Sequence, residues 1–504
     1  MMKKDVNLNF NTGMGQGFSR YANDVQIVNC FPVSTPGERS TTQLVPIPGG
    51  VKLATLSPSV GSGCRGLWTA STGPASNGFV ATMYGVFGNS LFRIKADGTG
   101  VFIGNLQNSM AYCSFAENQD QTSSGTMGFV CDGVTVYTWD LKAENSAVAS
   151  TYKEAVLPYV NGSETERAIA KYISYNAYRL VLTCGNSVQW YFSELNSSEF
   201  KSINFESSES SPDQTVRVIS HGGNLWVLGA YSYDIFSPTF DANDPYTVGP
   251  GATGRIGCAN GDSVAQVGDL LFWLGQGDAS TNAVYMADRA GTITEITTPG
   301  IKNIIASWAY KSYAKGFAYN DQGRSFYVLT SALDKCTLVF DSVTGFWHRR
   351  SSSSNGTLDY WDVASVRACY GAIFYATSDS NSVNRFRYDV IKDQEGRPIT
   401  RMWQSPVFFE SGDYQRLLEA RLDVETGAYP SGEAHKAYLQ TVWDGRSGDR
   451  LLRSLGAPGD NKKQVSFLSC GSGRNLVLRI GTSSPAPVIF YSIRLVIDSS
   501  GRNA

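Results

Sequence analysis

The chain has 504 residues, a formal net charge of −2 and 17% charged residues, against roughly 25% in an average soluble domain. This is longer than a typical domain with a single hydrophobic core, and it suits one large domain together with a second domain. The near-neutral balance offers no global basic field, which excludes a protein that grips DNA through its overall charge. The low fraction of charged residues, together with 51 glycines and 26 tyrosines, indicates many turns and a surface covered by partners.

The cysteines and the apolar stretches of the sequence indicate the cellular compartment in which the protein is assembled. Nine cysteines occur without a C-x-x-C pair, and several stand within apolar strand sequence, such as Cys131 and Cys336. We expect them to be reduced, small core residues of a protein assembled in a reducing compartment. No apolar stretch follows the basic start Met1–Lys4, and none approaches about 18 residues, so neither a signal peptide nor a transmembrane helix is expected.

In chain order, residues 1–50 come first and differ in kind from the rest. They combine a polar, glycine-rich stretch at 7–17 with prolines at 32, 36, 46 and 48. Such a segment has too little apolar mass to fold alone, so we predict an extended N-terminal arm with short strand pieces. It either packs on its own propeller or reaches a neighbouring subunit. Its aromatic residues Phe18, Tyr21 and Phe31 are candidate interaction residues. We expect deletion of residues 1–30 to weaken assembly and to leave the protein folded.

Residues 51–400 contain a recurring hairpin. Its clearest copy, Asp269 to Ile296, has an apolar strand at 270–274, a turn at 275–282, and strands at 283–287 and 292–296. The corresponding first strands recur at spacings of 45 to 55 residues. They are anchored at Tyr84, Phe129, Val181, Val227, Trp273, Val328 and Phe374. This period is typical of a β-propeller, here of six or seven blades, and the alternative is a large all-β protein with irregularly spaced hairpins.

Three further segments stand out between the hairpins. Residues 199–213 are polar and acidic, and we predict a loop at the channel or rim of an assembly. Its candidate residues are Glu199, Glu206, Glu209 and Asp213. Residues 240–254, rich in Asp, Pro and Gly, predict a second loop. Residues 303–314 have a short amphipathic pattern that predicts a helix.

Residues 401–504 alternate apolar and polar side chains over about six segments, which predicts a small C-terminal β-sandwich-like domain. This part carries 13 Lys and Arg against 10 Asp and Glu, which leaves 29 against 34 in the first 400 residues. The C-terminal domain is therefore the better candidate for contact with an acidic partner.

The chain lacks recognisable catalytic motifs. His221, His348 and His435 lie in separate segments without metal-ligand spacing, and no nucleophile elbow or P-loop occurs. The sequence thus predicts no catalytic residue, no metal site, no cofactor and no hydrolase activity. His348 precedes Arg349 and Arg350, which we interpret as the solvated basic end of a strand. These two arginines are candidates for contact with an acidic neighbour.

The order of several motifs resembles a family of short-tailed bacteriophage virion proteins. These motifs are G-M-G-Q-G-F at Gly13, N-C-F-P-V at Asn29, P-I-P-G-G at Pro46 and V-A-Q-V-G-D-L-L-F-W-L at Val264. The family comprises tail-hub or nozzle proteins, also called packaged-DNA stabilisation or head-completion proteins. The likeness covers most of the chain, and the C-terminal domain matches least.

The resemblance implies a structural virion protein, assembled in the host bacterial cytoplasm and without membrane insertion. It implies a homo-oligomeric ring, generally a hexamer, below the portal and adaptor. Such a ring continues the DNA channel, retains packaged DNA and carries tail needle, fibre or spike proteins. Double-stranded DNA would pass through the lumen without sequence-specific binding, and a wall of few charges suits that passage.

A second hypothesis is a β-propeller that binds or cleaves glycans. It has the support of fold analogy and of the 61 aromatic residues, which can stack on sugars or fill blade cores. Size separates the two hypotheses, because a hub forms a ring whereas an enzyme is active alone.

Overall fold

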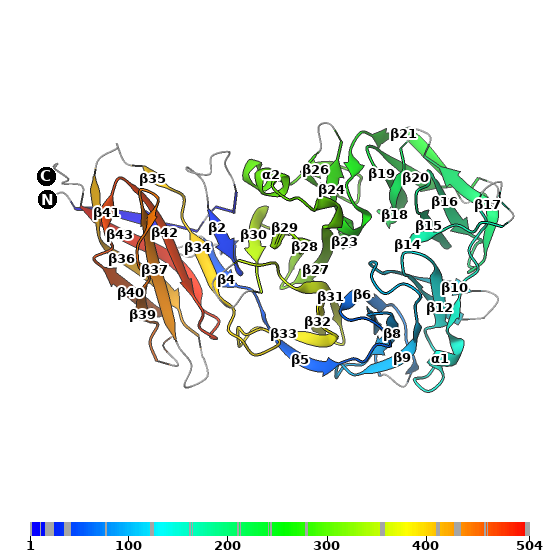
Figure 1. The fold of residues 1–504 in the computed structure, drawn as a ribbon, viewed down its shortest axis with the longest axis horizontal. Coiled ribbons are helices and arrows are strands. Elements are labelled where there is room, and N and C mark those ends of the chain that lie inside the picture. Colours follow the sequence, from blue (N-terminus) through cyan, green and yellow to red (C-terminus); the bar gives the residue numbers. More distant parts are fainter. Residues whose placement is uncertain are drawn as a thin grey trace.

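The computed structural model describes most of the chain. The described residues are 3–10, 12–15, 25–34, 42–75, 78–120, 125–160, 163, 165–208, 211, 213–239, 241, 244–277, 281–352, 358–409, 414–427, 435–457, 460 and 462–498. They form an all-β protein of two bodies, a β-propeller and a β-sandwich (Figure 1). The all-β class, the propeller and the C-terminal sheets confirm the prediction from sequence.

Within the described residues, seven consecutive sheets surround one axis (Figure 1). Blade 1 has β6 (Cys64–Ala70), β7 (Thr82–Phe87), β8 (Ser90–Ile94) and β9 (Gly100–Asn105). Blade 2 has β10 (Ser114–Asp120), β11 (Gly125–Cys131), β12 (Val136–Asp140) and β13 (Lys153–Glu154). Blade 3 has β14 (Ala170–Asn176), β15 (Arg179–Cys184), β16 (Gln189–Ser193) and β17 (Phe200–Ser207). Blade 4 has β18 (Thr215–His221), β19 (Asn224–Gly229), β20 (Tyr233–Pro238) and β21 (Tyr246–Gly254).

The last three blades follow the same plan. Blade 5 has β22 (Gly257–Cys258) and β23 (Ala265–Val267) sharing its first position, then β24 (Leu270–Gln276), β25 (Val284–Ala287) and β26 (Ile293–Glu295). Blade 6 has β27 (Lys315–Asp321), β28 (Arg324–Ser331), β29 (Cys336–Asp341) and β30 (Phe346–Arg350). Blade 7 has β31 (Val363–Cys369), β32 (Ala372–Thr377), β33 (Ser382–Arg387) and, from the N-terminal part of the chain, β5 (Gly49–Thr55).

The predicted hairpin at 269–296 is confirmed as blade 5. Its tight turn closes with a hydrogen bond from the Gly291 N–H to the Asp288 carbonyl oxygen at 3.0 Å, and Gly291 has a φ of 91°. The expected loops were wrong at two places, because β17 and β21 are the outermost strands of blades 3 and 4. The polar composition of these strands reflects their place at the blade edge, where one face meets solvent.

The few helices are short. Among the described residues they are α1 (Val148–Thr151), α2 (Pro299–Ala306) and the 3-10 turns η2 (Gly261–Ser263) and η3 (Lys311–Tyr313). The helix expected at 303–314 is shifted to Pro299–Ala306, and only a 3-10 turn at Lys311–Tyr313 follows within the expected range. Proline suits the first turn of a helix, which explains the earlier start.

The strand β5 closes the ring. It pairs antiparallel with β33, with Val51 opposite Arg385, so residues from the two ends of the propeller share one blade. Gly50 passes so close to blade 7 that a Cβ there would lie 1.8 Å from the Tyr375 hydroxyl. The closure therefore requires glycine at this position.

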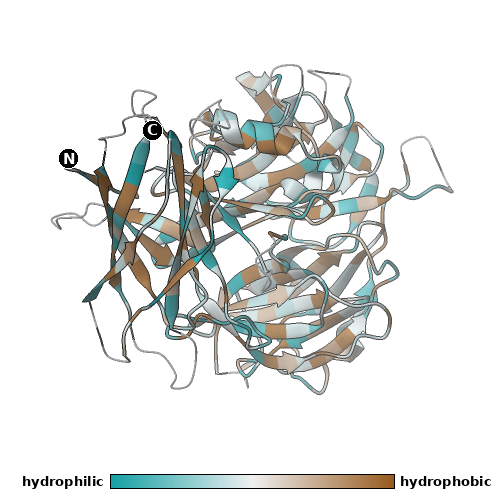
Figure 2. Cartoon of the chain, turned by 60° about the vertical axis from the view of Figure 1, so that its left-hand side comes forward, coloured by the Kyte–Doolittle hydropathy of each residue, from teal (hydrophilic) through white to brown (hydrophobic). Residues whose placement is uncertain are grey.

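The sandwich packs two sheets face to face. One contains β3 (Cys30–Ser34), β4 (Thr42–Pro46), β43 (Ile489–Asp498), β36 (Gln415–Glu425) and β40 (Lys462–Leu468), with β1 (Lys3–Leu8) on β43 and β41 (Ser472–Gly473) on β36. The other contains β34 (Arg401–Gln404), β42 (Asn475–Thr482), β37 (Lys436–Trp443) and β38 (Arg446–Ser447), with β35 (Phe408–Phe409) and β39 (Leu451–Ser454). Hydrophobic and hydrophilic bands alternate along these strands (Figure 2). The apolar side chains meet in one core.

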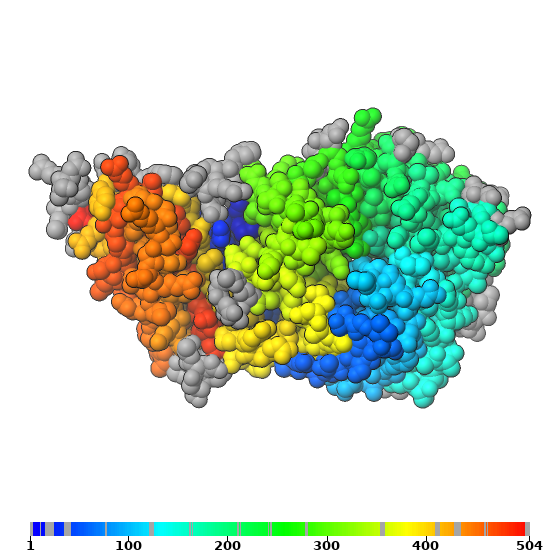
Figure 3. Space-filling model, viewed as in Figure 1, coloured from blue at the N-terminus to red at the C-terminus, as the bar shows by residue number. Residues whose placement is uncertain are grey.

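The N-terminal residues join the two bodies. The strand β2 (Gln26–Val28) pairs in parallel with β30 of blade 6 and antiparallel with β34 of the sandwich, so one sheet runs from propeller to sandwich. Part of this segment is visible between the two bodies in Figure 3, in dark blue. Residues 1–50, expected as an extended arm, thus supply strands to the sandwich, to the connecting sheet and to blade 7. The expectation that they do not take part in folding was wrong, because strand pairing provides the burial that the segment cannot supply alone.

Candidate functional site

The propeller and the sandwich meet at Asn29. This residue is 1% exposed and has a left-handed backbone with a φ of 56°. Its Nδ2 donates to the carbonyl oxygens of Ser351 and Thr400, both at 2.9 Å, and its Oδ1 accepts from the Ser351 N–H at 2.9 Å. Its own N–H donates to the Arg349 carbonyl oxygen at 2.9 Å, and its carbonyl oxygen accepts from the Ile47 N–H at 3.1 Å. One side chain thus binds the end of blade 6 to the start of the sandwich.

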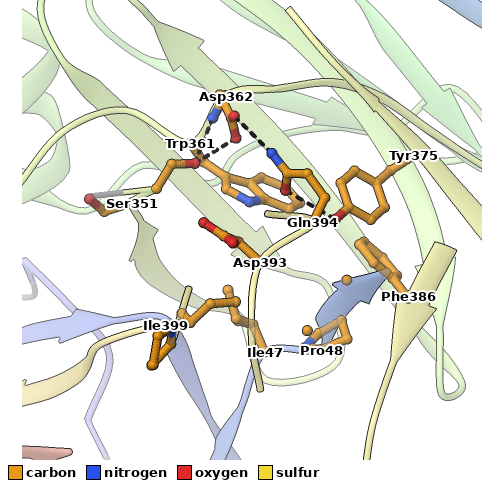
Figure 4. A pocket seen from close by; sticks show the side chains of 14 residues that line it. Ile47, Pro48, Ser351, Trp361, Asp362, Tyr375, Phe386, Asp393, Gln394 and Ile399 are labelled. Atoms are coloured by element: carbon orange, nitrogen blue, oxygen red, sulfur yellow. Dashed lines mark hydrogen bonds between the residues drawn. The ribbon is translucent and has the colours of Figure 1, made fainter. Parts of the chain in front are cut away.

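A small pocket lies beside this junction, between blade 7 and the connecting residues 391–399 (Figure 4). Gln394 Nε2 donates to Asp362 Oδ2 at 3.3 Å, and the Tyr375 hydroxyl donates to Gln394 Oε1 at 3.2 Å. Ser352 Oγ donates to Asp362 Oδ1 at 2.6 Å. Burial raises the pKa of Asp362, and the hydrogen bonds from Ser352 and Gln394 oppose that shift. With a volume of about 30 Å³, the pocket has room for water only, so its network serves to fix the connection.

The basic end of β30 is buried. His348 and Arg350 are both 0% exposed, so the expected solvated strand end was wrong. The Arg350 guanidinium lies 4.6 Å from the centroid of Trp361 and 5.3 Å from that of Phe326, and its nitrogens have no hydrogen-bond partner among the described residues. The burial follows from the aromatic side chains on this face of β30, because Phe31 of β3 lies 5.8 Å from the His348 ring and Trp361 covers Arg350.

Of the other predicted interaction residues, two contact their own chain and two lie outside the described residues. Phe31 is buried against blade 6, with its ring centroid 5.4 Å from that of Phe326, and it therefore contacts its own propeller. Arg349 donates from Nη2 to the Lys335 carbonyl oxygen at 2.8 Å. Phe18 and Tyr21 lie outside the described residues.

The acidic residues predicted at 199–213 do not lie together in one loop. Glu199 is exposed just before β17, and Glu206 lies within β17, opposite Trp190. Asp213 holds a turn of blade 4, where its Oδ2 accepts from the Ser232 N–H at 3.0 Å and its Oδ1 from the Ser232 hydroxyl at 2.8 Å. Glu209 lies outside the described residues.

The axis of the propeller contains a cavity of about 220 Å³, lined by residues of all seven blades. Its described lining residues include two arginines, Arg217 and Arg367, and no Asp or Glu. The paired carboxylates of a glycosidase are therefore not found among them. Sequence reasoning missed both arginines, because the residue alone does not show that an inner blade strand points it at the axis.

The cysteines are all buried with free thiols. Burial raises the pKa of Cys30 to about 12, so its thiol is uncharged and unreactive at neutral pH. Among the residues that the structure describes, no group of three or more His, Cys, Asp or Glu side chains is placed to hold a metal ion.

The sandwich carries an open groove of about 780 Å³ over β36, β40 and β43. Three cations line it, Lys462, Lys463 and Arg494, against one carboxylate, Asp423. Asp423 accepts hydrogen bonds from Gln464 and Ser492 at 3.0 Å each. This face is a candidate surface for an acidic neighbour, as the net charge of this part of the sequence suggested.

The stability of the protein is expected to fall between pH 7 and pH 5.5 because of His348. Burial and the Arg350 charge lower the pKa of His348 well below 6.5. Below about pH 6.5, His348 binds a proton in the unfolded chain but stays neutral in the folded chain. This difference lowers the free energy of unfolding by about 1.4 kcal/mol at pH 5.5. Chemical denaturation at both pH values measures this loss. The variant His348→Leu should lose less stability by that amount, and an identical loss in both proteins would contradict the assignment.

The sheet order defines a β-propeller with an appended β-sandwich. A family model described as Bacteriophage P22 Gp10, beta-propeller, matches residues 18–390. The chain belongs to this family of phage stabilisation proteins, which confirms the resemblance seen in the sequence. Membership favours a structural, non-enzymatic protein of the virion. None of the described helices is long and apolar enough to cross a membrane.

The chain is also similar to solved structures at low sequence identity. The Pan2 WD40 domain of Neurospora crassa is 9% identical, with 67% of this chain and 94% of that chain covered and a TM-score of 0.38. An exo-beta-1,3-galactanase from Phanerochaete chrysosporium is 9% identical, with 77% and 96% covered and a TM-score of 0.26. The extracellular domain of the putative hybrid two component system BT4673 from B. thetaiotaomicron is 10% identical, with 83% and 47% covered and a TM-score of 0.42. These scores carry no argument about function, and no curated protein matches the chain.

Proposed function

We propose that this protein forms a ring-shaped tail hub of a short-tailed phage, below the portal and adaptor. The ring, of six copies, continues the DNA channel, helps to retain packaged DNA and carries tail needle, fibre or spike proteins. The observation that carries the proposal is the family match over residues 18–390. The continuous sheet from blade 6 to the sandwich adds support, because strand pairing joins the two bodies of the subunit rigidly, as the wall of a ring under mechanical force requires.

The wall of the channel is proposed to be weakly charged. DNA carries one negative charge per roughly 1.7 Å of its axis, so each added Lys or Arg would create a phosphate contact that slows ejection. We place the outer edge of blade 3, with Glu199 and Glu206, at the channel or rim of the ring. The basic groove of the sandwich is proposed to face an acidic neighbour in the tail.

The position of the acidic edge can be measured by DNA release from assembled particles. The substitution Glu206→Lys should slow release at low salt and restore it at high salt, because salt screens phosphate contacts. Glu419→Lys, on the sandwich, serves as a charge-matched control. Release that is unchanged at every salt concentration, in particles that assemble normally, would place this edge elsewhere.

The hub itself is tested by mass and by particle composition. Native mass spectrometry of the full chain with its adaptor should show a ring of six copies, and purified virions should contain the same number. Particles assembled without the protein should package DNA and then lose it to nuclease. A protein that stays monomeric with the adaptor and is absent from virions would favour the alternative, a glycan-binding or glycan-cleaving propeller.

A further inference from the structure

The axial cavity contains a buried cation with unused hydrogen-bond donors. Arg217, on the inner strand of blade 4, is 7% exposed, and its guanidinium stacks on Tyr172 at 3.9 Å from the ring centroid. Its Nε and Nη1 are buried and have no hydrogen-bond partner among the described residues. A buried charged donor left without an acceptor costs considerable free energy. Arg217 therefore needs a hydrogen-bond acceptor, and the described protein atoms do not supply one.

A second guanidinium lines the same cavity. Arg367 comes from the inner strand of blade 7, three blades around the ring from blade 4 and thus across the axis. Its Nη1 donates to the carbonyl oxygens of Val366 at 3.0 Å and Ala318 at 3.4 Å. Two like charges facing one cavity repel each other, and water can accept their hydrogen bonds without neutralising them.

The described lining contains no carboxylate that could neutralise these two charges. Asp262, on the turn before β23, accepts a hydrogen bond from the Tyr172 hydroxyl at 2.7 Å, and no described hydrogen bond or ion pair joins it to Arg217. The remaining lining is apolar or neutral, with Trp68, Phe115 and Gln266 among its members. The cavity is thus a cationic site within a largely uncharged wall.

We propose that this cavity binds a small, free oxyanion of the phosphate type. Guanidinium groups match the oxygen spacing of phosphate, and an anion with several terminal oxygens can accept from arginines on both sides of the axis. The volume of about 220 Å³ admits such an anion with water and is far too small for a DNA duplex. The site is separate from the channel of the proposed ring, and its ligand would link blades 4 and 7 across the propeller.

The test uses the full chain in phosphate-free buffer at constant ionic strength. Inorganic phosphate is titrated by calorimetry, and its effect on the thermal midpoint is recorded in parallel. We expect saturable binding with one site per chain and a rise in the midpoint, since a ligand of the folded state stabilises it. Arg217→Gln and Arg367→Gln should each weaken binding by at least roughly tenfold, because each removes charge-assisted hydrogen bonds.

The controls separate this site from general anion effects. Arg289→Gln removes an arginine that is 74% exposed on a turn of blade 5, and it should bind phosphate like the parent protein. If Arg217→Gln does not fold, Arg367→Gln, which is only partly buried, still decides the matter. Equal phosphate binding in the parent and the Arg367→Gln protein, or no binding in the parent, would overturn the proposal. Acetate that binds as tightly as phosphate would overturn the assignment to a phosphate-type anion.

Discussion

Deleting residues 1–30 is expected to unfold the sandwich and to yield little soluble protein. The deletion removes β1 and β2, together with Phe10 and Ile27, which are both 0% exposed in the sandwich core. It also exposes the edges of β30, β34 and β43, whose unpaired backbone groups favour aggregation. Soluble yield and far-ultraviolet circular dichroism measure the result. A soluble, fully folded product that only fails to assemble would restore the interpretation of this segment as an assembly arm.

A single substitution tests the same point more finely. Phe10 packs edge-on against Trp403 with ring centroids 5.0 Å apart, so it joins the N-terminal segment to the sandwich. Phe10→Ala should lower the free energy of unfolding by about 3–5 kcal/mol, as for other buried aromatic residues. Tyr313→Ala, which truncates a side chain that is 67% exposed, should change it by less than about 0.5 kcal/mol. Equal effects would show that the N-terminal segment is not part of the core.

Replacing Asn29 with alanine is expected to cost about 4 kcal/mol of unfolding free energy. The change removes three hydrogen bonds between the side chain and the backbone of Ser351 and Thr400, and it forces alanine into a left-handed conformation. Because these bonds join propeller and sandwich, thermal unfolding should also separate into two transitions. Differential scanning calorimetry measures both effects.

Two further variants divide the cost between backbone and side chain. Asn29→Gly keeps the left-handed conformation without strain and loses the hydrogen bonds, so it should be more stable than Asn29→Ala by about 1 kcal/mol. Asn29→Asp keeps the acceptor oxygen and places a charge against two carbonyl oxygens, so it should be as damaging as alanine. A single transition with a loss below about 1 kcal/mol in all three variants would contradict the role assigned to Asn29.

The sequence alone predicted a propeller followed by C-terminal sheets, without the strands that residues 1–50 add to both. The recurring hairpins placed the propeller within residues 51–400, and the alternation after residue 401 predicted the sheets of the sandwich. Both signals are local, because the pattern of apolar and polar residues along each strand indicates which of its faces is buried. The buried, free cysteines follow the same logic, since they stand in apolar strand sequence.

The tertiary structure decided what covers each strand. His348 and Arg350 have the composition of a solvated strand end, and they are buried because aromatic residues cover their face of β30. One of these residues, Phe31, lies more than 300 positions earlier in the chain. Residues 1–50 lack apolar mass of their own, and they become structural because distant strands offer them open edges. Arg217 and Arg367 become one site only when the ring closes. Pairings between residues far apart in the chain leave no periodic pattern in either partner, and so they could not be predicted from the sequence.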